Sequence, residues 1–163
     1  MADNTIVRHM VESGPEEVGS ALKLEAENEY IERRETTAEL KAGADSVASI
    51  LNKHGVLWFG TLSDGTVVGQ DVNDKTLRKV SQVIRERVSP SFDLSVDKAV
   101  FDGRPCVRVE FSGDNAPYAS NKVFFIRVAD EDTKMDPDQV RSVIRRQEDK
   151  RGTWDESARP AAT

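Results

Sequence analysis

The sequence predicts an α+β domain in which a mixed, largely antiparallel sheet is flanked by helices. Apolar residues recur at helical spacing in separate stretches, and the segments between them show the alternation or the continuous apolar runs of strands. The strands of the second half follow one another through short turns, which is typical of antiparallel neighbours. A chain of 163 residues fits one such domain.

The strongest single signal lies at residues 50–69. Residues 56–59 form a continuous apolar run between glycines, as expected of a strand buried on both faces. Residues 63–65, Ser-Asp-Gly, tolerate positive φ and predict a hairpin turn into a second strand. We therefore expect this stretch to form the centre of the sheet.

The N-terminal part is expected to begin with a flexible leader at residues 1–14, followed by the domain at 15–148. Pro15 and the two glutamates after it predict the start of a short helix. Its buried side would be formed by Val18, Leu22 and Leu24. Residues 29–35 are predicted to be extended.

Three further helices and three further strands are expected. Apolar spacing predicts helices over residues 38–52 and 74–88 and after Asp136, with Asp74 as an N-cap and Gly55 as a C-terminal cap. The strands are predicted at residues 92–101, 104–111 and 123–128.

The charge of the chain limits how it could bind nucleic acid. The net charge is −6 at pH 7 and the pI is about 5.0. Nucleic-acid affinity comes mainly from contacts of Lys and Arg with phosphates. If this chain binds DNA or RNA, it must therefore use a local basic patch and keep its acidic residues elsewhere.

The sequence also bears on compartment and redox chemistry. No apolar run approaches the roughly 20 residues of a membrane span, and the N-terminus lacks the apolar core of a signal peptide. Both observations predict a cytoplasmic protein without a membrane partner. Cys106 is the single cysteine, which excludes an intrachain disulfide and a cysteine metal cluster.

Five segments, taken in order, carry a family resemblance. They are Glu-Asn-Glu-Tyr-Ile-Glu-Arg-Arg at 27–34, the helix end, apolar strand and turn at 48–69, Val-Ser-Pro at 88–90, Ala-Pro-Tyr at 116–118 with Phe-Ile-Arg-Val-Ala at 125–129, and Asp-Pro-Asp-Gln-Val at 136–140. Together they resemble the Schlafen AlbA-type domain, also described as a DNA-binding domain and formerly as a divergent AAA ATP-binding domain. The resemblance covers about residues 25–147.

The resemblance implies a mixed α+β fold and, for bacterial members, a role with nucleic acids. Those members carry the module before a winged-helix region in transcriptional regulators. The implied function is a nucleic-acid-binding N-terminal module of a bacterial-type transcriptional regulator or helicase-like protein, with DNA or structured RNA as its partner. Residues 149–163 are polar and are interpreted as a linker-like tail.

A second hypothesis is a metal-dependent nuclease. Some Schlafen relatives cleave structured RNA with two glutamates and one aspartate that can hold a divalent cation. By motif, the glutamates are Glu27 and Glu32. The aspartate falls in the turn where this chain has Leu62 and Ser63, with Asp64 just beyond. These three acids would be both the catalytic residues and the Mg²⁺ or Mn²⁺ ligands, but a solvated acidic face and an ordinary turn residue are the simpler explanation.

The candidate phosphate ligands are cations carried by predicted strands, helices and one loop. They are Arg33, Arg34, Arg108, Lys122, Arg127, Arg141 and Arg145. Arg127 stands out because it lies in an apolar strand, where a charge is costly without a partner. Its alternatives are an outward-facing position or a salt bridge with an acid such as Glu32.

Two other possibilities concern ATP and self-association. The chain lacks the Gly-x-x-x-x-Gly-Lys-Ser/Thr loop, so ATP binding is not predicted despite the older family label. Eukaryotic Schlafen proteins pair two copies of this domain. A third hypothesis is therefore a dimerisation or interaction module without nucleic-acid binding, which a homodimer of this chain would provide.

Overall fold

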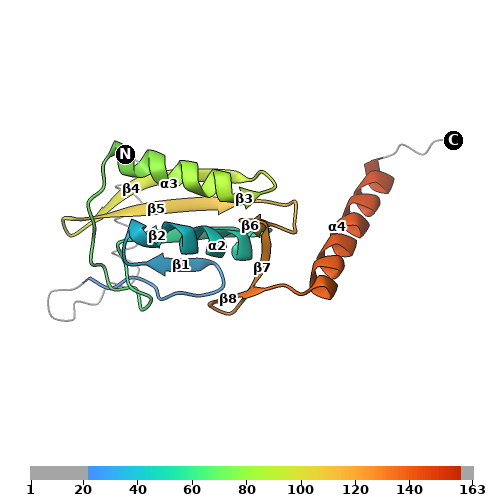
Figure 1. Cartoon of the computed structure of the whole chain (residues 1–163), viewed down its shortest axis with the longest axis horizontal. Helices are drawn as coiled ribbons and strands as arrows, with labels where there is room; N and C mark the ends of the chain where they lie inside the picture. Colours follow the sequence, from blue (N-terminus) through green and yellow to red (C-terminus); the bar gives the residue numbers. More distant parts are fainter. Residues whose placement is uncertain (1–21, 159–163) are drawn as a thin grey trace.

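The computed structural model describes residues 22–158 and confirms the predicted α+β class (Figure 1). The strands are β1 (Ile31–Arg34), β2 (His54–Phe59), β3 (Val88–Ser89), β4 (Asp93–Phe101), β5 (Arg104–Ser112), β6 (Ala119–Ser120), β7 (Val123–Val128) and β8 (Glu131–Lys134). The helices are η1 (Thr37–Glu39), α2 (Leu40–Ile50), α3 (Asp74–Arg87) and α4 (Pro137–Ala158). None of these helices is long and apolar enough to cross a membrane.

The strands form two four-stranded sheets in the described part of the chain. The first has the order β1-β2-β5-β4, with β1 parallel to β2 and the other pairs antiparallel. The second has the order β3-β6-β7-β8 and is antiparallel throughout. The apolar run predicted to be central is β2, which lies between β1 and β5 inside the first sheet.

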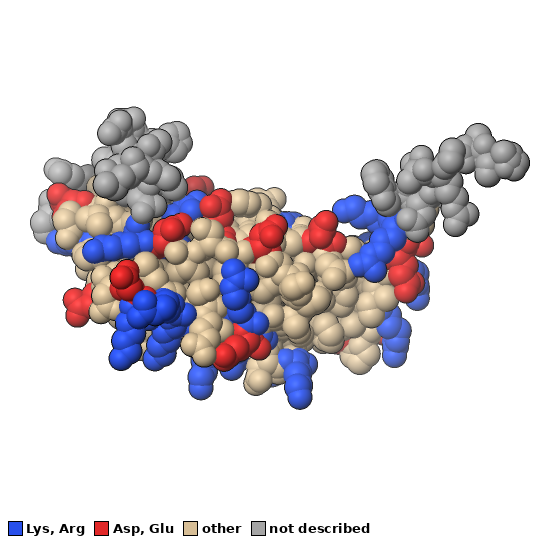
Figure 2. All heavy atoms as spheres, turned by 90° about the horizontal axis from the view of Figure 1, so that it is seen from above, with Lys and Arg blue, Asp and Glu red and all other residues tan. Residues whose placement is uncertain are grey.

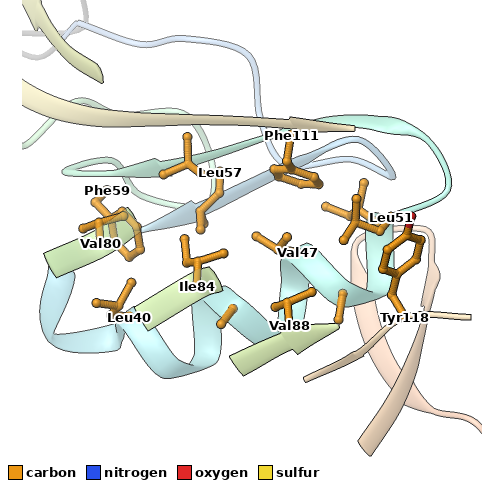
Figure 3. Packing of buried hydrophobic residues seen from close by; sticks show 14 of the residues in the cluster. Leu40, Val47, Leu51, Leu57, Phe59, Val80, Ile84, Val88, Phe111 and Tyr118 are labelled. Atoms are coloured by element: carbon orange, nitrogen blue, oxygen red, sulfur yellow. The ribbon is translucent and has the colours of Figure 1, made fainter. Parts of the chain in front are cut away.

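The main core lies between one face of the first sheet and helices α2 and α3 (Figure 3). Leu57, Phe59 and Phe111 of the sheet contribute to the same buried cluster as Val47 of α2 and Ile84 of α3. Each large side chain buried in this way stabilises the fold by about 1.5–3 kcal/mol. The apolar residues that recur at helical spacing in the sequence are therefore the residues with which α2 and α3 contact the sheet.

Gly43 sets how closely α2 approaches the sheet. A Cβ at this position would lie 3.1 Å from both Leu57 Cδ2 and Phe59 Cζ. A glycine inside a helix costs about 0.5–1 kcal/mol relative to alanine, and here it allows the helix to pack directly against β2. Gly43 is thus a packing residue.

A second buried cluster covers the opposite face of the first sheet. It contains Leu22, Leu24, Trp58, Val67, Ala99, Phe101 and Cys106. Leu22 and Leu24 are buried, while Lys23 between them is half-buried. The backbone of Lys23 forms an isolated antiparallel β-bridge with Thr66. The prediction of a helix here is wrong for these residues, because their alternation has the period of extended chain. Residues 1–21 lie outside the described residues.

The turn at residues 63–65 is present, but the strand expected after it is not. Thr61–Val67 and Lys23–Thr66 are isolated bridges. Gly65 has φ +96°, and a Cβ there would lie 2.1 Å from the carbonyl oxygen of Leu24. The close crossing of residues 22–24 therefore takes the place of a regular second strand.

Three boundaries also differ from the predictions. Leu51 rather than Gly55 is the C-terminal cap of α2, because Gly55 already lies in β2. The N-cap of α3 is Asn73 rather than Asp74, because Asn73 forms a capping box with Thr76. Helix α4 continues to Ala158, so residues 149–158 are helical rather than a linker. Figure 1 shows α4 leaving the body of the domain beyond β8.

Candidate functional site

Strand β1 carries charged side chains to both of its sides. Glu32 and Arg34 approach α2, where both contact Ser46. Arg33, between them, lies over the ring of Trp58 on β2. This alternation follows from the two-residue period of a strand, and it places three candidate residues in two different environments.

Glu32 and Arg127 form a buried ion pair. Arg127 Nη2 lies 3.2 Å from Glu32 Oε1, and each side chain is only 4% exposed. The same Nη2 donates to the carbonyl oxygens of Asn28 and Ile31, at 3.0 and 3.1 Å. Arg127 of β7 thus joins the second sheet to the segment around β1, and the salt bridge considered as an alternative for Arg127 is present.

Other polar groups complete this ionic network. Arg34 Nη2 lies 2.5 Å from Glu32 Oε2, and the Ser46 hydroxyl lies 2.8 Å from the same oxygen. Asp132 accepts from Arg127 Nη1 at 2.7 Å and from Ser49 Oγ at 2.5 Å. We call Glu32, Arg34, Ser46, Ser49, Arg127 and Asp132 the ionic network.

Glu27 lies at the margin of the network. Its Oε2 accepts from the backbone N–H of Arg33 at 2.9 Å. Burial, then a hydrogen bond and repulsion from Glu32, raise the pKa of Glu27 to about 7, although the Arg33 N–H and Arg127 act against the rise. Glu27 and Glu32 are therefore neighbours, as their motif suggested, and they share a proton-dependent contact.

The acids and β1 cations line an open pocket of about 490 Å³. Its walls are formed by Glu27, Glu32, Arg33, Arg34, Ser63, Asp130, Glu131 and Asp132. Five of these eight residues are acidic. A nucleic-acid backbone would meet mainly like charge here, so this pocket does not favour phosphate binding.

Asp64 does not join the two glutamates. Ser63 lines the pocket, whereas the Asp64 carboxylate accepts from the Thr66 N–H at 2.9 Å and lies 3.8 Å from Lys23 Nζ. The hydrogen bonds from Thr66 hold the pKa of Asp64 below its usual value. Asp64 is thus a turn residue, because a carboxylate shifted along a tight turn points in another direction.

A divalent cation does not fit the predicted Glu27, Glu32 and Asp64 set. Both oxygens of Glu32 are already bonded to arginines or serine, and the Asp64 carboxylate contacts Thr66 and Lys23 instead of the two glutamates. Within residues 22–158 no group of three His, Cys, Asp or Glu is placed to hold a metal ion. The catalytic and metal-ligand interpretation of these three acids therefore has no matching geometry.

Arg33 and Arg108, on the two strands that flank β2, both lie against the indole of Trp58. Each guanidinium carbon is 5.9 Å from the Trp58 ring centroid, and the register of β1, β2 and β5 aligns the three residues. Arg108 also donates to Glu110 at 3.0 Å. Arg33 is 3% exposed, and burial lowers its pKa to about 10. Both arginines therefore have partners within the domain.

The remaining predicted cations are exposed. Lys122 lies in the turn before β7, and Arg141 and Arg145 lie on α4. Arg141 forms a surface pair with Asp138. The structure therefore separates the seven predicted cations into four with structural partners and three on the surface.

Sequence reasoning missed the exposed cations of α3 as candidates. Arg78 and Lys79 lie three and four residues after Lys75. All three are exposed and have no ion partner among the described residues. Figure 2 views the molecule from above, the side on which α3 lies in Figure 1, and shows Lys and Arg side chains over this face with Asp and Glu side chains between them. The helical period was the signal that could have identified this row.

The family model described as Schlafen, AlbA_2 matches residues 27–136. The chain belongs to this family. Among solved structures, this chain is similar to the DIP2311 protein from Corynebacterium diphtheriae, with a TM-score of 0.56 and 16% sequence identity. The match covers 83% of this chain and 27% of that protein, and at this identity it shows a shared fold alone. A search of curated proteins found no match.

Proposed function

We propose that this domain binds DNA or structured RNA through its phosphate backbone, as a cytoplasmic module of a transcriptional regulator or helicase-like protein. The observation that carries the proposal is the row of Lys75, Arg78 and Lys79 on the outer face of α3. Membership of the Schlafen AlbA_2 family, with its nucleic-acid-related members, supports the same conclusion.

The row suits phosphate contacts because its cations are rigidly spaced and available. Residues at i, i+3 and i+4 share one side of a helix. Val80 and Ile84 anchor the opposite side of α3 in the core, so the helix is held at a fixed orientation. Arginine adds a planar fork that can contact two phosphate oxygens.

The net charge of −6 limits the affinity. A few cations on an acidic chain give binding without base readout, for which Kd is typically about 10⁻⁴–10⁻⁶ M at physiological salt. Lys122, Arg141 and Arg145 are further surface cations that could extend the contact. Self-association into a homodimer would double the basic surface and strengthen the binding.

Binding of the full chain to a labelled DNA duplex and an RNA hairpin, followed by anisotropy across salt concentrations, tests the proposal. The variant Lys75→Gln, Arg78→Gln, Lys79→Gln is expected to weaken binding to both and to lower the salt slope by about 3, roughly 1 for each lost contact. The matched control, Lys41→Gln, Lys98→Gln, Lys134→Gln, removes the same charge from exposed lysines of α2, β4 and β8.

Equal weakening in both triple variants would show that only the total charge matters and would reject the α3 site. Absence of salt-sensitive binding at low ionic strength would reject nucleic-acid binding altogether. The same mixtures incubated with Mg²⁺ or Mn²⁺ also report any cleavage. Cleavage lost in Glu32→Gln would restore the nuclease hypothesis in place of simple binding.

A further inference from the structure

A pocket of about 400 Å³ lies between α4 and the body of the domain. It lies among the C-terminal end of α2, strand β7 and the first half of α4, away from the exposed row on α3. Known small-molecule pockets of proteins occupy roughly 300–1,000 Å³. The space therefore has the size of an organic ligand rather than of a single ion.

The walls of this pocket are apolar on both sides. Ile50 and Leu51 end α2, and Phe125 of β7 lies beside them. Val143 forms part of the opposite wall, from α4. A ligand with an apolar body would contact the domain and α4 at the same time, and each Å² of apolar surface that it covers favours binding.

The rim of the pocket is positively charged. Lys53, Arg146 and Lys150 all line it, and all three are exposed. Glu29 also lines the pocket and forms an ion pair with Lys53, at 3.6 Å, whereas Arg146 and Lys150 have no ion partner among the described residues. Two adjacent free cations above apolar walls are complementary to an anionic head group.

Helix α4 is fixed at the far edge of the pocket by polar contacts. Gln147 donates to the carbonyl oxygen of Asp114, and Arg151 donates to Asn115 Oδ1. Val143 makes a partly buried contact with the main core cluster. These few contacts hold α4 beside the pocket, so that the helix forms one wall of a pocket that is still open to solvent.

We propose that this pocket binds a small organic anion, with an apolar body against Ile50, Phe125 and Val143 and a carboxylate, sulfonate or phosphate head against Arg146 and Lys150. The site goes beyond the proposed nucleic-acid function and uses none of the α3 cations. Such a ligand would join α4 to the domain through its body and its charge together.

The probe for the test is 8-anilinonaphthalene-1-sulfonate, titrated by fluorescence into the full chain. Saturable one-site binding is expected. Arg146→Gln with Lys150→Gln is expected to weaken it about tenfold, as for loss of a charge-assisted contact. Val143→Phe, which fills the pocket, is expected to weaken it to a similar extent. Lys98→Gln with Lys134→Gln removes the same charge elsewhere and should leave the binding unchanged, as should the α3 triple variant.

Far-UV circular dichroism first establishes that each variant is folded, because this probe also binds loosened cores. Binding that Val143→Phe does not change would place the probe elsewhere and overturn the proposal. If both double charge variants weakened binding of the probe equally, the attraction would be non-specific and the proposal would be rejected. A single-stranded oligonucleotide that competes with the probe, and is itself weakened by Val143→Phe, would assign the pocket to a nucleic-acid base instead. The proposed function is tested separately, by nucleic-acid binding of the α3 triple variant, so either proposal can fail without the other.

Discussion

The two sides of β1 bury charge in different ways. On the side facing α2, Arg127 has two carboxylates and two backbone carbonyls as partners. On the side facing Trp58, Arg33 donates from Nε to the carbonyl oxygen of Glu25 at 2.7 Å, but its two terminal nitrogens are buried without a hydrogen-bond partner. Both arginines are almost completely buried.

The difference shows that burial alone does not say what an arginine does. Arg127 neutralises Asp132 and shares the neutralisation of Glu32 with Arg34, so several elements depend on it. Arg33 is held by stacking on an aromatic ring, an interaction that contributes about 0.5–2 kcal/mol. We therefore expect the two positions to respond very differently to the same substitution.

The largest effect is expected for Arg127→Met. It removes the cation but leaves Glu32 and Asp132 buried, which should lower the free energy of unfolding by about 3–5 kcal/mol. Urea denaturation followed by circular dichroism measures this change. Arg141→Met is the matched control, because Arg141 pairs with Asp138 on the surface and should change stability by less than about 0.5 kcal/mol. Similar values for the two variants would show that the ionic network adds little.

An intermediate effect on stability, which depends on pH, is expected for Glu27. This residue contacts the backbone of Arg33 and lies beside Glu32. Its pKa is about 7 in the folded protein and near 4.5 in the unfolded chain. Between these values the folded state binds more protons, so this group makes the protein less stable as pH rises through the window. Glu27→Gln removes the proton equilibrium and keeps an acceptor for the Arg33 N–H.

The expected gain for Glu27→Gln is on the order of 1 kcal/mol above pH 7, after allowance for solvent screening, and close to zero below pH 4.5. Denaturation midpoints measured from pH 4 to 8 report it. Glu35→Gln, at an exposed glutamate, is the control. A difference from wild type that stays constant over this range would contradict the assigned proton sharing between Glu27 and Glu32.

The smallest effect is expected for Arg33→Met. Methionine keeps the apolar stem against Trp58 and removes two buried nitrogens that have no hydrogen-bond partner, so losses and gains nearly cancel. The free energy of unfolding should change by less than about 1 kcal/mol in the same urea assay. A loss as large as that of Arg127→Met would mean that Arg33 has a charged partner of equal importance.

The sequence predicted the regular elements where a local period was strong. Residues 38–52 and 74–88 correspond to α2 and α3, and the continuous apolar run corresponds to β2. Boundaries were harder because neighbouring residues offer the same chemistry. Asn73 and Asp74 can both cap a helix, and the reciprocal bond with Thr76 decides between them.

The candidate site was predictable only in part. The motif brought Glu27 and Glu32 together, but Asp132 and Ser46 were missed because their contact joins residues 86 positions apart. No local pattern records such a contact. Arg127 was recognised as unusual from its apolar strand, since a buried charge needs a partner. Glu32 was already named as a partner for Arg127, and the structure adds Asp132 of β8 as the second one.

Arg127 also has a consequence for strand register. Because side chains alternate along a strand, moving β7 by one residue would bring Ile126 or Val128 to the place that Arg127 occupies. Both are apolar, so Asp132 would lose the cation that contacts it and Glu32 would keep only Arg34. One guanidinium therefore makes a single alignment of the second sheet against the first much more favourable than its nearest alternatives.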